Sequence, residues 1–292
     1  MLRIDPAEKL VAQRNFLNQM RPMNKQPTRY ILLYSILLVI IASGISLHAQ
    51  RTKSSLMAGE QRNAEKGLRD NRYFFYFINT SITNLGTDEE KKMFKEAIQR
   101  DIIAQNLYMK FMFGESFTEI RKAQKILIEL CQQTLSRDIV TAKKLLNGFA
   151  SAVVKSNDHL ARHYLHLGYR DAADARIDMI MADNFQERLY SMRLYRYAKA
   201  IKKVKHGKRY ALFSLLETKF SAVKKKEFGR LNYDELKQLI SEASRDDQRE
   251  YHLLVHTDNY YRSKDEISFY DRIWEKPDLF EIKEYEEYMQ MK

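Results

Sequence analysis

The sequence predicts an all-α protein with one membrane-spanning helix close to its N-terminus. Its 292 residues include only 9 Gly and 4 Pro, too few for folds that depend on many tight turns or on glycine-rich ligand loops. Apolar residues recur at three- and four-residue steps along most of the chain, and no strand-like alternation of useful length interrupts them. A hydrophobic fraction of 45% and an aromatic fraction of 12% exclude disorder as the main state.

The membrane-spanning helix is predicted over residues 30–49, which read YILLYSILLVIIASGISLHA and carry no charge. At about 1.5 Å per residue, such a helix crosses a hydrocarbon core of roughly 30 Å. Arg29 precedes it, and Arg51 and Lys53 follow it, so basic residues mark both ends. A cleaved signal peptide is the competing interpretation, but the leader is long for one and Leu47 makes a poor cleavage site. We therefore expect an uncleaved anchor.

The leader, residues 1–29, is basic, but basic residues also follow the predicted span, so the charge rule for membrane orientation is nearly balanced. A first hydrophobic segment behind a short basic leader usually leaves its N-terminus in the cytoplasm. We therefore expect a single-pass protein of the inner (plasma) membrane with a periplasmic or otherwise extracytoplasmic C-terminal domain. Residues 50–70 are expected to form a helical stalk, 71–230 a helical repeat-like domain, and 231–292 an acidic, aromatic C-terminal helical segment.

The elements of the domain are predicted from local sequence signals. Residues 71–78, NRYFFYFI, are interpreted as a buried helix because no neighbouring segment offers a strand partner. Thr87 and Glu90 fit a capping box, in which each side chain accepts the backbone N–H of the other residue, so a helix is expected to begin there and run to Gly114. The same apolar period predicts helices over 117–133, 136–154 and 157–167.

Two further junctions suggest an internal repeat. One helix is expected to end at Gly168 and the next to begin at Tyr169, and a second junction is expected at Gly207. The pattern Gly168-x-Arg170-x-Ala172 thus recurs as Gly207-x-Arg209-x-Ala211, 39 residues later (207 minus 168). The small residues would let two helices pack closely, and the spacing suits a helix-hairpin repeat.

This pattern resembles the tetratricopeptide family, whose repeat ends its first helix in a small residue and begins the second with an aromatic residue, followed three positions later by a small one. Gly168, Tyr169 and Ala172 match that pattern, and Gly207 and Ala211 repeat part of it. The resemblance implies an α-solenoid-like stack of helical hairpins that binds proteins on a concave face and performs no chemistry.

Basic residues are concentrated between Arg188 and Arg230, where 14 Lys and Arg stand against two Glu, whereas residues 231–292 are acidic. Such segregation indicates either an interaction surface or internal pairing of two faces. We expect the basic surface to bind an acidic protein partner, through Arg188, Arg193, Arg196, Lys199, Lys202, Lys203, Lys208 and Arg209. The alternatives are a solvated face partly neutralised by the C-terminal segment, a surface for anionic lipid, and, least favoured, one for nucleic acid.

The C-terminal segment contains the single Trp, Trp274, and is too aromatic to be a plain acidic tail. It is expected to dock on the basic region 188–230 of its own chain or of a neighbouring copy. The second arrangement would build a homo-oligomer through a head-to-tail contact.

No signature of catalysis is present. The motifs GxSxG, GxxxxGK[ST] and GxGxxG are absent from the sequence. His159, His163 and His166 share one predicted helical face but lack the Glu of an HExxH site, so we interpret them as surface or packing histidines. Cys131 lies among apolar residues and is predicted to be in the core. We therefore expect no enzymatic activity, no cofactor and no bound metal.

These features predict a membrane-anchored scaffold for protein–protein interaction, or an accessory subunit of a cell-envelope assembly in secretion, motility or wall maintenance. The alternative is a cytoplasm-facing, tethered binder of anionic lipid or nucleic acid. Which side of the membrane carries the domain decides between them.

Overall fold

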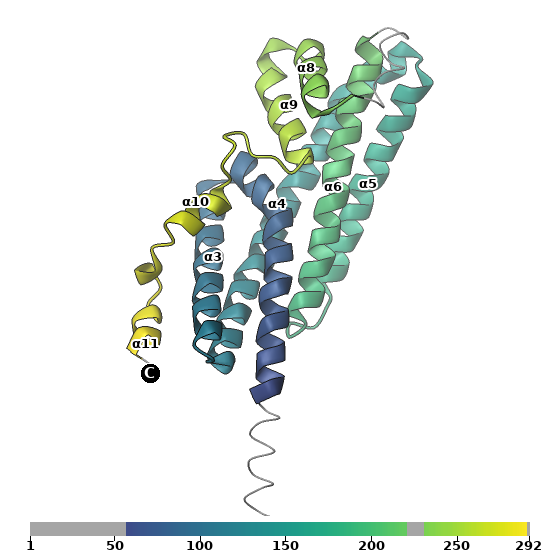
Figure 1. Ribbon diagram of the computed structural model, residues 1–292. Helices are drawn as coiled ribbons and strands as arrows, with labels where there is room; N and C mark the ends of the chain where they lie inside the picture. The colour runs from purple at the N-terminus through teal and green to yellow at the C-terminus, as the bar shows by residue number, and fades with distance from the viewer. Residues whose placement is uncertain (1–56, 221–230, 291–292) are drawn as a thin grey trace, which may run out of the picture. The chain divides into compact units, whose positions relative to one another are not determined.

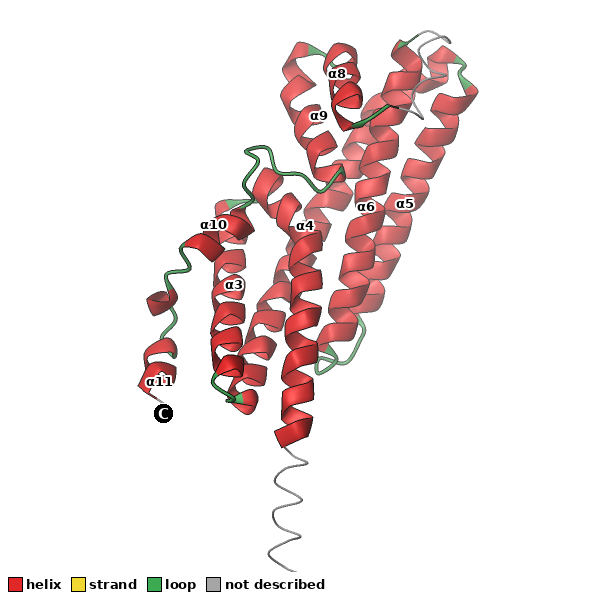
Figure 2. Ribbon diagram, in the orientation of Figure 1, coloured by secondary structure: helices red, strands yellow, loops and turns green. Residues whose placement is uncertain are grey.

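The computed structural model describes residues 57–220 and 231–290. Every described residue belongs to one compact unit, Met57–Lys292. The predicted leader, the predicted membrane helix 30–49 and residues 50–56 of the predicted stalk lie outside the described residues. Within the described residues all regular elements are helices (Figure 2), which confirms the all-α prediction.

The domain consists of five long helices followed by shorter ones (Figure 1). The first helix covers residues 57–85, and the next four are α3 (Asp88–Met109), α4 (Phe113–Ser156), α5 (His159–Asp183) and α6 (Tyr190–Lys219). After residue 230 come α8 (Tyr233–Ala243), α9 (Asp246–Asn259), α10 (Phe269–Glu275), the 3-10 helix η2 (Leu279–Glu281) and α11 (Tyr285–Gln290).

The first helix runs without a break through the boundary predicted between stalk and domain at residues 70 and 71. Its N-terminal part is already packed, because Ala64 is buried in a small cluster with Ala104 and Ile120. Further along, Phe75 and Ile78 enter the main core. Residues 57–70 are therefore helical, as predicted, but they are part of the folded unit.

The capping box at the start of α3 is confirmed. The backbone N–H of Thr87 donates to Glu90 Oε2 at 2.7 Å, and the N–H of Glu90 donates to Thr87 Oγ1 at 3.2 Å. The helix ends at Met109, earlier than predicted, and the chain turns through Phe111, whose φ of 62° is left-handed.

A single 44-residue helix, α4, replaces the two helices predicted over 117–133 and 136–154. The residues between them include neither Gly nor Pro, so nothing in the sequence interrupts the backbone hydrogen bonds there. Asn157, in the left-handed conformation, ends α4, and the Asp158 side chain accepts the N–H of Ala161 to cap α5.

The helix ends predicted at Gly168 and Gly207 are wrong, because both glycines lie inside continuous helices, α5 and α6. The two helices form an antiparallel pair in which these glycines face each other. A Cβ on Gly168 would lie 3.2 Å from the carbonyl oxygen of Gly207, and one on Gly207 would lie 3.1 Å from that of Gly168. The recurring pattern therefore marks a close helix crossing, and the tetratricopeptide-like hairpin stack is not found in the described domain.

The other residues of the predicted repeat take different places at this crossing. Ala172 packs against Gly207, and Ala211 is fully buried. Tyr169, predicted to pack, is exposed, and its hydroxyl donates to Asn147 Oδ1 at 2.6 Å. The expectation of close packing by small residues is thus confirmed, although the helix ends drawn from it are not.

The C-terminal elements pack on α3 and the start of α4. Lys95 Nζ lies 2.8 Å from Glu281 Oε1, Lys122 Nζ lies 2.9 Å from Glu284 Oε1, and Ile282 packs against Ile103. The sequence predicted docking on the basic region 188–230, whereas these final residues dock on α3 and α4.

Candidate functional site

The basic side chains of α6 are largely paired with other parts of the same domain. Asp178 of α5 accepts a hydrogen bond from Arg196 Nη1 at 2.9 Å, and its Oδ2 forms an ion pair with Lys203 Nζ at 2.8 Å. Lys203 also donates to Asp174 Oδ2 at 3.2 Å. Lys199 lies 3.7 Å from Asp178. The aspartates of α5 thus neutralise part of the predicted basic surface, a role that the solvated-face alternative gave to the C-terminal segment.

The remaining predicted basic residues differ in exposure. Arg188 is exposed and donates to Gln186, Arg193 is half-buried, and the Lys202 ammonium lies 4.3 Å from the centre of the Phe77 ring. Arg209 is half-buried, stacks on Tyr260 and donates to a backbone carbonyl. Among the predicted partner-binding residues, Arg188 and Lys199 are the exposed ones.

Lys208 was predicted to bind a partner, but it has no exposed surface and belongs to a buried cluster of charges. Its ammonium lies 2.8 Å from Asp258 Oδ2 and 3.0 Å from Asp138 Oδ2. Lys205, equally buried, lies 2.8 Å from Asp258 Oδ1. The cluster therefore has two cations and two carboxylates, and it joins α4, α6 and α9. An interior position removes Lys208 from any exposed surface.

Hydroxyl groups of the first helix complete this cluster. Thr80 Oγ1 donates to Asp258 Oδ1 at 2.9 Å and accepts Lys205 Nζ at 2.7 Å, while Ser81 donates to the same carboxylate at 3.1 Å. Every carboxylate oxygen of Asp258 thus has partners, which is the condition under which buried charges are tolerated. The acidic segment 231–292 does meet the basic region here, within one chain.

The pKa values in the cluster follow from burial and from these neighbours. Burial alone would raise the pKa of Asp258, but the ammonium groups of Lys205 and Lys208 outweigh it and hold that pKa well below its usual range. Burial likewise opposes the charge on Lys208, yet Asp138 and Asp258 together raise its pKa. Asp258 and Lys208 are thus held in their charged forms, whereas burial lowers the pKa of Lys205.

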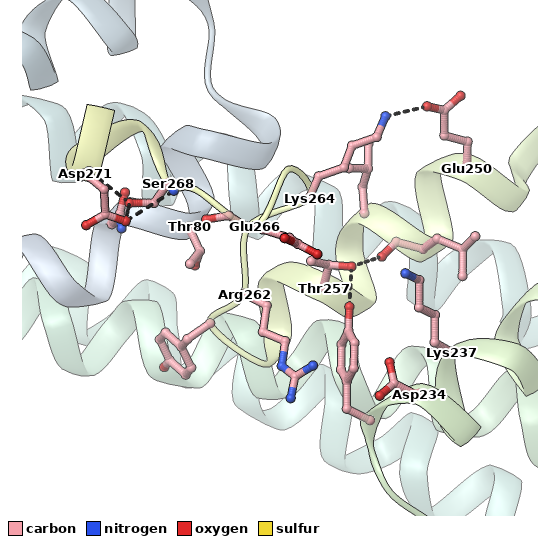
Figure 3. A pocket seen from close by; sticks show the side chains of 16 residues that line it. Thr80, Asp234, Lys237, Glu250, Thr257, Arg262, Lys264, Glu266, Ser268 and Asp271 are labelled. Carbon is pink, nitrogen blue, oxygen red and sulfur yellow. Dashed lines mark hydrogen bonds and ion pairs between the residues drawn. The ribbon is translucent and has the colours of Figure 1, made fainter. Parts of the chain in front are cut away.

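A cleft of about 630 Å³ opens beside this cluster, between α8, α9, the segment 260–268 and the C-terminal half of the first helix (Figure 3). Thr80 lines the cleft and connects its wall to the buried Asp258. Arg262 stacks on the ring of Tyr233 at 4.0 Å, and Lys264 Nζ lies 2.9 Å from Glu250 Oε1. The cleft therefore has a polar lining of both charge signs, and in its wall Ser268 Oγ donates to Asp271 Oδ2 at 2.6 Å.

The segment 260–268 adopts a strained backbone at this cleft. Tyr261 has a φ of 54° and Glu266 a φ of 63°, and both residues line the cleft. A left-handed conformation in a residue with a Cβ costs free energy, and such residues concentrate at ligand-binding and switch regions. The segment is tied to the first helix by Asn84, whose side chain donates to the carbonyl of Arg262 at 2.8 Å.

The sequence indicated none of these cleft residues as a site. They come from segments more than 150 positions apart, and each segment taken alone reads as ordinary helix or turn. The spacing of Thr80 and Asp258 in the sequence contains no information about their 2.9 Å contact. The residues in the left-handed conformation are not glycines, so the sequence did not indicate these backbone positions either.

The structure also shows where the predicted core cysteine and the three histidines of α5 lie. Cys131 is buried in the main core, as predicted, and burial raises the pKa of its thiol. His159, His163 and His166 are exposed on α5, and among the described residues no group of three His, Cys, Asp or Glu side chains is arranged to hold a metal. Within residues 57–220 and 231–290, none of the helices has an apolar stretch long enough to span a bilayer.

Comparison with known proteins assigns the domain to a family. The model of the family described as surface protein adhesin OmpL37 matches residues 58–288, most of the chain and nearly all of the described domain. Neither a curated protein nor a solved structure shows significant similarity to the chain. Because the family match covers well over half of the sequence, the chain belongs to the OmpL37 family of surface protein adhesins.

Proposed function

We propose that this protein is a cell-surface adhesin whose helical domain binds other proteins outside the cell while residues 30–49 anchor it in the membrane. The family match supports the proposal because it begins at residue 58 and so coincides with the folded domain. The uncharged segment 30–49 lies ahead of that domain and supplies a means of attachment. The cleft's polar side chains of both charge signs support a binding role.

In this proposal, the part of the predicted basic surface that binds a partner consists of its two exposed residues. Arg188 and Lys199 are exposed to an acidic partner, and Lys199 has only a long contact of 3.7 Å with Asp178, whereas Arg196 and Lys203 approach that carboxylate within 3 Å. Replacing both exposed residues by Glu tests whether this face contributes. A matched control is Arg170→Glu, because Arg170 is an exposed cation on α5 outside the set.

The proposal is tested with the full chain on intact cells. An epitope tag after Lys292 is expected to bind antibody without permeabilisation, and cells that produce the protein are expected to attach to a decellularised protein matrix better than cells that lack it. Equal attachment of the two kinds of cell would refute the adhesive role.

The alternative function, a cytoplasm-facing binder of anionic lipid or nucleic acid, makes the opposite prediction. The tag would then be reached by antibody only after permeabilisation, and binding of the purified chain to a polyanion would fall steeply with salt.

A further inference from the structure

Three depressions adjoin one another along the outer face of helix 57–85. The first lies between Leu68 and Arg72 of this helix and Met109 of α3 and has a volume of about 320 Å³. The second, of about 440 Å³, lies between Arg72, Tyr76 and α10. The third is the polar cleft of Figure 3.

Neighbouring depressions share wall residues. Arg72 lines the first and the second, and Asn79 and Asp271 line both the second and the polar cleft. Positions 68, 72, 75 and 79 follow one another at three- and four-residue steps, so they lie on one face of the helix. The depressions thus form one groove that follows this face, here called the helix 57–85 groove.

The middle of the groove has aromatic walls. Tyr76 is 58% exposed and Trp274 is 37% exposed, although both are large rings, and the buried Phe75 forms the floor, with its ring 5.4 Å from that of Tyr270. Exposed Tyr and Trp beside Arg are the residue types that contribute most free energy at protein interfaces. This composition is that of a surface covered by a partner.

Two exposed cations along the groove, Arg69 and Arg72, form no ion pair with a residue in the described part of the chain. Arg72 does lie close enough to the buried Asp101 to lower the pKa of that carboxyl. The carboxylates of Asp70 and Asp101 beside them are already used, since Asp70 accepts Lys66 at 2.7 Å and Asp101 accepts Asn71 at 2.7 Å. This end of the groove is therefore complementary to negative charge.

The opposite end has a different character. Asp271, Glu266 and Asp234 line it together with basic residues, so a uniformly anionic chain would meet carboxylates there. From Leu68 to Asn79 the helix rises by about 17 Å, which matches about five residues of extended polypeptide. These features favour a short peptide segment over a long anionic polysaccharide.

We infer that the helix 57–85 groove binds a short, extended, acidic segment of a partner protein, whose carboxylates pair with Arg69 and Arg72 and whose aromatic side chains stack against Tyr76 and Trp274. The inference rests on the proposed adhesive function and names the site and the kind of segment that it takes. The carboxylate–arginine pairs lie at the solvent-exposed rim of the groove. The aromatic contacts lie at its centre, where the peptide covers them, and they stabilise the complex.

The test uses the full chain in detergent micelles and labelled peptides of about six residues. A peptide of alternating Glu and Tyr is compared with one of Lys and Tyr, which reverses the charge, and one of Glu and Ser, which removes the rings. Trp274 is the only Trp in the sequence. Excitation at the long-wavelength edge of the Trp absorption band avoids the tyrosines, so the emission reports on the groove. We expect the Glu and Tyr peptide to bind best and to shift the Trp emission to the blue.

Two variants assign the binding to the groove. Arg72→Glu is expected to weaken binding of the Glu and Tyr peptide by about tenfold or more. Tyr76→Ser, which removes a ring that also stacks on Tyr261, is expected to weaken binding of the same peptide. The matched control is Arg176→Glu, the same charge reversal on an exposed residue of α5, which is expected to leave binding unchanged.

Several results would overturn the inference. One is that the Lys and Tyr peptide binds as tightly as the Glu and Tyr peptide, and another is that Arg176→Glu weakens binding as much as Arg72→Glu does. A heparin oligosaccharide that displaced the Glu and Tyr peptide completely would indicate a polysaccharide site. Absence of any peptide binding up to millimolar concentration would also overturn it. In that case the attachment assay on intact cells still decides the adhesive function separately.

Discussion

Lys208 Nζ of α6 lies 2.8 Å from Asp258 Oδ2 of α9, and neither side chain has any exposed surface. This contact attaches the short α8 and α9 pair to the long helices and so holds one wall of the polar cleft in place. Removing one member of a buried pair leaves an uncompensated charge and costs about 3–5 kcal/mol.

We therefore expect Asp258→Ala to lower the free energy of unfolding by about that amount, because it leaves both Lys205 and Lys208 without their shared carboxylate. Urea unfolding followed by circular dichroism measures the loss. The control is Lys199→Met, which alters an exposed cation 3.7 Å from Asp178 and is expected to change stability by less than about 1 kcal/mol. A similar small change for Asp258→Ala would contradict the account of the cluster.

Asp101 is expected to make stability depend on pH. Burial raises its pKa to about 6, although hydrogen bonds from Asn71 and Gln105 offset part of that effect. In the unfolded chain its pKa is about 3.9, so the folded state binds the proton more tightly. This contribution to stability is fully present below about pH 4 and is lost as pH rises to about 6.

Asp101→Asn removes the titration while keeping the shape of the side chain. The free energy of unfolding of the variant, relative to the parent, is expected to rise between pH 4 and pH 6 by at most about 3 kcal/mol. Unfolding by urea at several pH values measures the difference. Parallel pH profiles of the two proteins would show that the pKa of Asp101 is not raised by burial.

The crossing of α5 and α6 predicts opposite effects for two Gly→Ala substitutions. A Cβ on Gly168 would lie 2.5 Å from Leu146 Cδ2 and 3.2 Å from Gly207 O, so Gly168→Ala is expected to destabilise the fold by about 1–3 kcal/mol. Gly148 in α4 has no atom within 4 Å of that position, and Gly148→Ala is expected to stabilise by about 0.5–1 kcal/mol. Thermal unfolding distinguishes them, and a neutral Gly168→Ala would argue against the close crossing.

The single cysteine offers a direct measure of unfolding. Cys131 is buried in the core and its thiol pKa is raised by burial, so a thiol reagent is expected to label it slowly in the native protein and rapidly in urea. The ratio of the two rates reports the population of open states. Fast labelling under native conditions would place Cys131 outside the core.

Local signals in the sequence determined much of the secondary structure. The capping box at Thr87 and Glu90 located the start of α3, because the two reciprocal hydrogen bonds involve residues three positions apart. The scarcity of Gly and Pro and the helical apolar period predicted an all-helical domain, and the apolar surroundings of Cys131 placed it in the core. Each of these inferences depends on interactions within a few turns of one helix.

Tertiary contacts decided the rest. Gly168 and Gly207 have the sequence context of helix ends, yet both lie within helices. Neither has a side chain, so the backbones of α5 and α6 approach closely there, and this approach depends on both residues together. Lys208 resembles its exposed neighbours in the sequence, and its burial follows from Asp138 and Asp258 on two other helices. The groove, likewise, exists only where helix 57–85 meets α3 and α10. A sequence pattern records which side chains are present, whereas the pairing of distant charges and the fit of two helix surfaces arise only when the chain is folded.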